Sequence, residues 1–479
     1  MEISSAEDIV TRLKYIFLHP FVSYWNSMTP TCMLAGVVVW IFLCSKQMLL
    51  MGNYQFGREY GTAKFSNPKN VTKRLGDKEE ENNRILSQSL RVSYNPSISK
   101  MNANTVIIGG PGRGKSFYVI VPNLLMCHGS LIITDTKGDL LREYGRYFEQ
   151  KGYRVKSLNL CEMEKSDRYN PFRYIRKPAD VSKLITNLIA NTTPTEQINS
   201  ADPFWERAER LYLQAIFHYV WLECPPGKKN FRSVLELLSK AEVVEGEESK
   251  LDVLMRHLSV RSPLGERHPA VSCYYKCIRG AGDTVRSIII SANSRFADFD
   301  NEELLWILDE DDMDIPFLGV GIHGDQKTKT ALFVVIPDDD DTWNFVPGLL
   351  FTQITQELYN QARVFGGKLP IDVGMWLDEF CNIQLSHVDK ILSTCRSRGI
   401  YMVMCIQALS QLKAIYKERY ETILGCADTL VYLGSGEQSS YKMASELLGK
   451  QTLDKRSRSE SYGFNGSVSA SVDALGREL

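Results

Sequence analysis

The stretch NTVIIGGPGRGKSFYVIVPNLL, residues 104–125, decides the fold. A short β-branched run leads into a glycine-rich turn, and an apolar pattern typical of a helix follows. Strand, loop and helix in this order, with the pattern GxxxxGK[ST], are the signature of a P-loop. Gly109, Gly114, Lys115 and Ser116 meet that pattern. The sequence therefore predicts a phosphate-binding loop in an α/β sheet.

The residues of this loop have distinct expected roles. Glycines let backbone N–H groups turn inward onto phosphate oxygens. Lys115 is expected to reach the β- and γ-phosphates and Ser116 to bind magnesium, so the expected cofactors are ATP and Mg²⁺. The predicted nucleotide-binding residues are Gly109, Gly110, Pro111, Gly112, Arg113, Gly114, Lys115 and Ser116.

A second apolar strand ends in carboxylates, in VGMWLDEF at 373–380. Asp378 is expected to hold Mg²⁺, directly or through water, and Glu379 to polarise the attacking water. A strand end with solvated acids is the alternative interpretation. The presence of a P-loop favours the catalytic one.

A third strand lies within GIYMVMCIQALSQL at 399–412 and brings Gln407 to its C-terminal end, where ligands bind in open α/β sheets. Gln407 can sense the γ-phosphate or position water. Arg396 and Arg398 precede the strand, and either can complete a neighbouring subunit's site as an arginine finger. The alternative, equally favoured by the spacing alone, is that both arginines are solvated surface residues.

Further short apolar runs at 130–140, 330–337 and 428–434 predict the remaining strands of a parallel sheet with crossover helices. Asp135 and Lys137 follow the first of these strands. They either border the nucleotide cleft or stabilise a turn at the strand end.

Residues 180–314 change to a mostly helical pattern, as in ADPFWERAERLYLQAIFHYVWLE at 201–223. The stretch falls inside the nucleotide domain and is therefore an insertion, a place where partner recognition is common. Its aromatic residues have helical spacing without interleaved arginines, which favours a core over base stacking. They are Trp205, Tyr212, Phe217, Tyr219 and Trp221.

Two acidic runs, at 307–314 and 338–341, are expected to be solvated loops, with docking of a basic partner as the alternative. Eleven cysteines at irregular spacings suit a reducing cytoplasm. Cys273 and Cys277 share a helical spacing, but no second ligand pair stands nearby, and we reject a zinc site.

The overall composition is that of an ordinary globular protein, with 479 residues, 44% hydrophobic and 24% charged. It excludes collagen, a disordered tail and a disulfide mini-protein. At roughly 150 residues per domain the length allows about three domains. The 56 basic and 57 acidic residues predict no global affinity for polyanions, so nucleic acid would bind at a local surface or lumen.

Residues 31–51 predict a transmembrane helix, and the stretch 15–28, interrupted by Pro20, is a weaker candidate span or an interfacial helix. A buried core helix is the alternative for the stronger span. Basic residues are fewer before it than after it, which places the long C-terminal part in the cytoplasm. They are Arg12 and Lys14 before, and Lys46, Arg58, Lys64, Lys69, Lys73 and Arg74 after.

The expected organisation follows from these segments. It comprises a membrane anchor at 1–51, a connector at 52–100, a first nucleotide-binding part at 101–179, an all-helical insertion at 180–314 and a second nucleotide-binding part at 315–479.

Together the motifs resemble those of the type IV secretion system coupling proteins, the membrane-anchored ATPases of conjugation and type IV secretion. The resemblance covers about Gly57 to Thr452. It rests on EYGTAKF (59–65), GGPGRGKS (109–116), TDTKGDL (134–140), RYNPF (168–172), DPFW (202–205), LDEF (377–380) and CRSRGIYMVMCIQALSQL (395–412).

This resemblance implies a RecA-like P-loop NTPase that drives DNA transfer as a homo-hexamer at the cytoplasmic membrane. By position, Lys115 and Ser116 match the phosphate and magnesium residues, Asp378 and Glu379 the acidic pair, Gln407 the sensor and Arg396 the inter-subunit arginine. The implied partners are single-stranded DNA, the relaxase or relaxosome, and channel components. The helical insertion would select the DNA-processing complex.

The chain departs from the family pattern in two ways. Members usually have two clear membrane helices and a longer chain, and we expect a product truncated from a larger reading frame. A docking receptor that does not hydrolyse ATP and a septal translocase of double-stranded DNA are the alternative functions.

Overall fold

The computed structural model describes residues 6–19, 25, 27–50, 61–193, 203–241, 248–279, 282–340, 342–383, 385, 387–451, 461–462, 468–469 and 477–478. The chain divides into two compact units. One comprises Met1–Lys64 with Ser445–Leu479, and the other is Phe65–Ala444.

The larger unit contains a seven-stranded sheet in which every pair of neighbouring strands is parallel. The strand order is β5-β6-β4-β7-β8-β3-β9. The strands are β3 (Thr105–Gly109), β4 (Ser130–Asp135), β5 (Arg154–Asn159), β6 (Thr330–Val335), β7 (Val373–Leu377), β8 (Ile400–Ile406) and β9 (Thr429–Gly434). The predicted α/β class and parallel sheet are confirmed.

The central strands are buried on both faces, as parallel strands covered by crossover helices must be. In β3, Val106 and Ile108 belong to one hydrophobic cluster and Ile107 to another, so alternate side chains enter opposite cores. The edge strand β5 was not predicted. Its sequence RVKSLN lacks an apolar run, and its first half is only partly buried.

A segment before the P-loop folds onto the sheet. The guanidinium of Arg84 is buried, with 2% of the residue exposed, and donates to the hydroxyls of Thr105 at 3.1 Å and Thr429 at 3.0 Å. The side chain of Asn123 bonds both backbone groups of Ile85. Residues 65–100 of the predicted connector therefore belong to the larger unit. They form α3 (Pro68–Leu75), β1 (Asn83–Ser87), β2 (Leu90–Ser93) and α4 (Pro96–Ser99).

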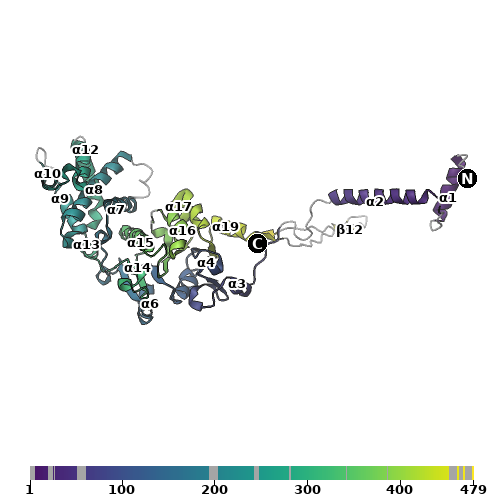
Figure 1. Ribbon diagram of the computed structural model, residues 1–479, viewed down its shortest axis with the longest axis horizontal. Helices are drawn as coiled ribbons and strands as arrows, with labels where there is room; N and C mark the ends of the chain where they lie inside the picture. Colours follow the sequence, from purple (N-terminus) through teal and green to yellow (C-terminus); the bar gives the residue numbers. More distant parts are fainter. Residues whose placement is uncertain are drawn as a thin grey trace. The chain divides into compact units, whose positions relative to one another are not determined.

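The helical insertion lies between β5 and β6, and its helices gather in a lobe beside the sheet (Figure 1). They are α7 (Pro178–Thr192), α8 (Pro203–Glu223), α9 (Phe231–Ser239), α10 (Lys250–Arg261), α11 (Pro269–Ile278), α12 (Gly282–Arg295) and α13 (Glu302–Asp309). The short α14 (Phe317–Val320) follows the lobe and lies near β6 (Figure 1). The remaining helices of the unit are α5 (Val121–Leu124), α6 (Asp139–Gln150), α15 (Phe345–Val364), α16 (Val388–Thr394), α17 (Leu409–Tyr416), α18 (Tyr420–Gly425) and the start of α19 (Gln438–Leu448).

The aromatic residues of α8 mostly form core, as predicted. Tyr212 and Phe217 are fully buried, and Tyr219 and Trp221 pack against the same cluster half-buried. Trp205 is 43% exposed near the start of the helix, so the core prediction is wrong for this residue. Helical spacing defines a face, but it does not say where along a helix the packing partners begin.

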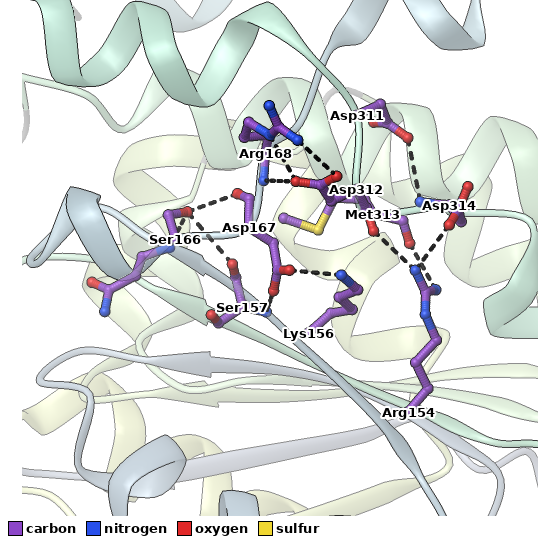
Figure 2. Close-up of polar contacts among 11 residues, drawn as sticks. Arg154, Lys156, Ser157, Ser166, Asp167, Arg168, Asp311, Asp312, Met313 and Asp314 are labelled. Carbon is purple, nitrogen blue, oxygen red and sulfur yellow. Dashed lines mark hydrogen bonds and ion pairs between the residues drawn. The ribbon is translucent and has the colours of Figure 1, made fainter.

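The acidic run at 307–314 is not a solvated loop, so that prediction is wrong. Ile307 and Leu308 are core residues of α13. Asp312 and Asp314 bond to Arg168 and Arg154, near and on strand β5 (Figure 2). Basic partners and hydrogen-bond donors elsewhere in the chain explain the difference, because they replace the water that an acidic run otherwise needs.

These contacts join the insertion to the edge of the sheet. Arg154 of β5 donates to Asp314 at 3.0 Å and to the carbonyl of Met313 at 2.9 Å. Arg168 pairs with Asp312 at 2.8 Å. Asp311 accepts the hydroxyl of Tyr174 at 2.6 Å. In the second acidic run, Asp338 and Asp340 are exposed, as expected, and Asp341 lies outside the described residues.

In the smaller unit, α2 (Thr29–Leu50) contains a 20-residue stretch, Thr29–Met48, long and apolar enough to cross a membrane by length and composition. None of that window is buried. The weaker candidate at 15–28 is not one helix in its described part. Its first residues belong to α1 (Ala6–Leu18), which ends before Pro20, and residues 27–28 form a turn. Proline lacks the N–H that helix continuation needs.

Elsewhere in that unit, the described residues include the end of α19 and two short antiparallel strand pairs. They are β10 (Lys450–Gln451) with β13 (Arg477–Glu478), and β11 (Ser461–Tyr462) with β12 (Val468–Ser469). Thr62 also forms a bridge with Gln451.

Candidate nucleotide-binding site

The predicted P-loop connects the end of β3 to a helical turn. Gly112 and Gly114 have φ angles of +68° and +75°, which favour glycine. A Cβ atom on Gly114 would lie 2.4 Å from the ring of Tyr118, so this position also requires a residue without a side chain. The amine of Lys115 donates to the carbonyl of Gly109 at 3.0 Å and is thus held within the loop. These features fit a cradle of backbone N–H groups and one cation around phosphate oxygens.

The helix after the loop begins with a π-helical turn, Ser116–Ile120, before the short α5. The N–H of Val121 bonds to the carbonyl of Ser116, five residues earlier. Pro122 has no N–H to continue an α-helical ladder, which explains the irregular start. Phe117 and Tyr118 project from this turn with exposed fractions of 72% and 65%.

The two predicted magnesium residues contact each other. The hydroxyl of Ser116 donates to a carboxylate oxygen of Asp378 at 2.5 Å. The backbone carbonyl of Asp378 accepts the hydroxyl of Thr134, from the adjacent strand β4, at 2.9 Å. Mg²⁺ takes oxygen ligands, typically one or two carboxylates together with substrate phosphates and waters. A hydroxyl and a carboxylate beside a phosphate cradle fit that donor set.

Glu379 is held by two side-chain amides. Gln407 donates to one of its carboxylate oxygens and Asn382 to the other, each at 3.1 Å. The backbone of Glu379 is left-handed, with φ of +53°, a conformation that costs a non-glycine residue about 1–3 kcal/mol. Backbone strain of this kind is concentrated at functional sites. Here the strained residue carries a carboxylate that accepts a hydrogen bond on each oxygen.

The order of the strands brings these residues together. β8 lies between β3 and β7, and all three are parallel. The P-loop, the Asp378–Glu379 pair and Gln407 each follow the C-terminal end of one of these strands. Ligands of open α/β sheets bind at the C-terminal ends of the strands.

Arg396 is not among the assembled residues. It precedes β8 and therefore lies at the N-terminal ends of the strands, opposite the site. Its side chain is exposed and has no hydrogen-bond or ion-pair partner in the described part of the chain, while its carbonyl accepts the N–H of Gly399. Arg398 instead donates to the carbonyl of Thr394 at 2.5 Å and lies over the ring of Tyr359, 4.3 Å from its centroid. Of the two arginines, Arg396 is the one available to a second subunit.

Asp135 and Lys137 have local partners. Asp135 accepts backbone N–H groups of Lys137 at 3.4 Å and Leu141 at 3.0 Å, as a strand-end turn requires. Burial raises the pKa of Asp135 despite these bonds. Lys137 pairs with Asp338 at 3.4 Å on the surface. The turn is the interpretation that the contacts favour.

Sequence reasoning missed three contributions to the site. Asn382 and Thr134 hold the acidic pair, and the carbonyl of Gly434, after β9, accepts the N–H of Gly110 at 3.0 Å. Asn382 stands three residues after Glu379 in a turn, a spacing that could have indicated it. The other two depend on strand neighbours that no local pattern encodes.

Comparisons with known proteins agree with this fold. The family described as type IV secretory system conjugative DNA transfer matches residues 59–479. The protein VirD4 of Rhizobium radiobacter is 22% identical, over 75% of this chain and 50% of that protein, and VirD4 of Agrobacterium fabrum is 23% identical, over 75% and 51%. The chain thus spans about half the length of the curated relatives it matches.

Solved structures of the plasmid coupling protein TrwB share the RecA-like fold. The complex with the non-hydrolysable ATP analogue ADPNP has a TM-score of 0.60 at 16% identity, covering 84% of this chain and 86% of that one. The complex with ADP and Mg²⁺ has a TM-score of 0.60 at 17% identity, with the same coverage. The family match extends over most of the sequence, and the chain therefore belongs to the conjugative DNA transfer family of type IV secretory systems, the coupling proteins.

Proposed function

We propose that this coupling protein hydrolyses ATP with Mg²⁺ to drive DNA transfer. The observation that carries the proposal is the hydrogen-bonded set at one sheet edge: Ser116 on Asp378, and Gln407 on Glu379. Motors of the P-loop class use such a set to hold phosphates and magnesium and to orient water. The TrwB complexes with ADPNP and with ADP and Mg²⁺ support nucleotide and magnesium as the ligands.

The proposed role of each residue follows from the chemistry of its side chain. Lys115 and the loop N–H groups hold the phosphates, and Ser116 and Asp378 hold Mg²⁺, which supplies Lewis-acid stabilisation of phosphate charge when bound. Glu379 orients a water molecule and accepts its proton. Gln407 keeps the Glu379 carboxylate in place through the bond at 3.1 Å.

The proposed assembly is a homo-hexamer in which Arg396 acts on the site of a neighbouring subunit. Its exposure and lack of a partner in the described residues support that role, because an arginine finger must be accessible in the free protein.

The proposed location is the cytoplasmic membrane, with α2 as the anchor and the larger unit in the cytoplasm. A fully exposed apolar helix needs an apolar surrounding, and the basic residues after it favour a cytoplasmic C-terminal side. The proposed partners are single-stranded DNA with its relaxase, and components of a type IV secretion channel.

The test is ATP turnover by the detergent-solubilised full chain, with and without single-stranded DNA, across a salt series. Lys115→Ala should abolish turnover, and Glu379→Gln should bind ATP without hydrolysing it. Stimulation by DNA that weakens with salt is expected of a motor that contacts phosphates. Unchanged turnover in either variant would refute the site. A folded, oligomeric protein with no turnover above the Lys115→Ala blank would instead be a docking receptor.

A further inference from the structure

The segment GSGEQSS at 434–440 runs from the last residue of β9 into the first turn of α19, and this loop contacts two parts of the nucleotide site. The carbonyl of Gly434 accepts the N–H of Gly110 in the P-loop at 3.0 Å. The hydroxyl of Ser435 donates to the carbonyl of Gln407 at 3.4 Å. One short segment thus reaches both the phosphate cradle and the residue that holds Glu379.

Glu437, in the middle of this loop, accepts four hydrogen bonds. Its two carboxylate oxygens accept the backbone N–H groups of Leu409 at 3.0 Å and Ser410 at 3.2 Å. They also accept the hydroxyls of Ser439 and Ser440. Burial acts to raise the pKa of Glu437, but these hydrogen bonds outweigh it and lower the pKa to about 2. The carboxylate is therefore ionised throughout the physiological pH range.

The N-terminus of α17 depends on this distant carboxylate. The residue at the N-cap is Ala408, which has no side-chain acceptor for the first N–H groups of the helix. Glu437 supplies that acceptor from another part of the chain, and its negative charge also suits the positive end of the helix. The hydroxyl of Ser440, which itself donates to Glu437, shares the N–H of Leu409 at 2.9 Å, whereas the N–H of Ser410 bonds to Glu437 alone among the described residues. Gln407 directly precedes Ala408, so the position of the helix start sets the position of Gln407.

We propose that Glu437 is a positioning residue for hydrolysis: by fixing the start of α17, it keeps Gln407 bonded to Glu379. The proposal rests on the proposed function, since it assigns Gln407 and Glu379 to the reaction. Glu437 acts through the backbone N–H groups of Leu409 and Ser410, which follow Ala408.

The first test is independent of hydrolysis. Glu437→Gln in the detergent-solubilised full chain keeps the size of the side chain but places an amide opposite N–H donors. Amide hydrogen exchange should become faster at Ser410, and less so at Leu409, whose N–H keeps Ser440 as an acceptor, and should remain unchanged in the strand β8. Glu418→Gln, an exposed glutamate just after α17, is the control and should leave both regions unchanged. Unchanged exchange at the start of α17 would overturn the proposal even if the protein proved not to be an ATPase.

The second test asks whether Glu437 acts through Gln407. Glu437→Gln should lower kcat about 10- to 100-fold with little change in the Kd for ADPNP, because positioning and not binding is lost. The double variant with Gln407→Ala should lose no more activity than Gln407→Ala alone. Losses that multiply would show that Glu437 acts elsewhere and would overturn the proposal.

A milder substitution covers the case in which Glu437→Gln does not fold. Ser435→Ala removes the bond to the Gln407 carbonyl and the acceptor for the N–H of Glu437, but keeps the carboxylate itself. It should also lower kcat, by a smaller factor than Glu437→Gln, and should add no loss in the Gln407→Ala background. If the parent protein hydrolyses ATP, full activity of Ser435→Ala would refute the role of the loop.

Discussion

Replacing Asp311 with asparagine should remove a pH dependence from the stability of the larger unit. Asp311 lies in the acidic run that joins the helical insertion to β5 (Figure 2). Burial raises its pKa from 3.8 to about 6, although the hydroxyl of Tyr174 and two backbone N–H groups act to lower it. A carboxyl with a raised pKa binds its proton more tightly in the folded chain, so its stabilising contribution is present at acid pH and is lost as pH rises through 6.

The size of the effect follows from the two pKa values. At about 1.36 kcal/mol for each pH unit, a rise from 3.8 to about 6 corresponds to about 3 kcal/mol over the whole titration. About 2 kcal/mol of this falls between pH 4.5 and 7.5. Asparagine cannot ionise, so the variant should lack this slope. Any cost of placing an amide beside the donors is constant with pH and does not enter the slope.

The assay is urea unfolding of the full chain in detergent, followed by circular dichroism at several pH values from 4.5 to 7.5. The neighbouring Asp312 provides a matched control of opposite sign. A hydrogen bond from Arg168 lowers its pKa, so it stabilises the fold above its unfolded pKa and loses that contribution only as pH falls. Asp312→Asn should therefore lower the free energy of unfolding by a nearly constant amount from pH 4.5 to 7.5, because the unfolded pKa and the lowered folded pKa of Asp312 both lie below that range.

If Asp311→Asn kept the slope of the parent protein, the carboxyl of Asp311 would not have a raised pKa in the folded chain. Loss of the same slope in Asp312→Asn would equally contradict the assignment, because the titration of Asp312 lies below the pH range of the assay.

Three further predictions concern the nucleotide domain. Gly114→Ala should weaken binding of a fluorescent ATP analogue about tenfold, since the new Cβ would meet the Tyr118 ring at 2.4 Å and φ is +75°. Arg84→Met should lower the free energy of unfolding by about 2–3 kcal/mol in urea titrations, because it removes charged hydrogen bonds beneath the sheet. Arg396→Ala should spare ATP binding and reduce turnover only in assembled protein. Equal loss at all protein concentrations would exclude the inter-subunit role.

The sequence was sufficient for the parts of the fold that local patterns encode. The strand β3, the glycine turn and Lys115 follow one another directly, and buried parallel strands such as β7 and β8 are continuous apolar runs. The C-terminal ends of parallel strands all lie on the same side of the sheet. Asp378, Glu379 and Gln407 follow such ends and could therefore be assigned to one site before any contact was known.

Features that depend on distant partners were missed or misjudged. Strand β5 is defined by its pairing with β6, since its own residues are largely polar. The acidic run looked solvated because its basic partners, such as Arg154, lie about 150 residues earlier in the chain. Glu437 caps a helix that begins 28 residues before it, and nothing near Ala408 in the sequence marks that dependence.

The order of the strands also separates the site from the helical insertion. The insertion begins after β5 and ends before β6, the two strands at one lateral edge of the sheet. The P-loop strand β3 is next to β9, which forms the other lateral edge. Strands β4, β7 and β8 stand between them, and β4 and β7 carry Thr134 and the backbone of Asp378, which bond each other at 2.9 Å. The insertion can therefore vary in sequence while the phosphate cradle stays intact. A conformational change transmitted through the sheet between the insertion and the P-loop must therefore pass through the strands that hold Asp378 and Glu379.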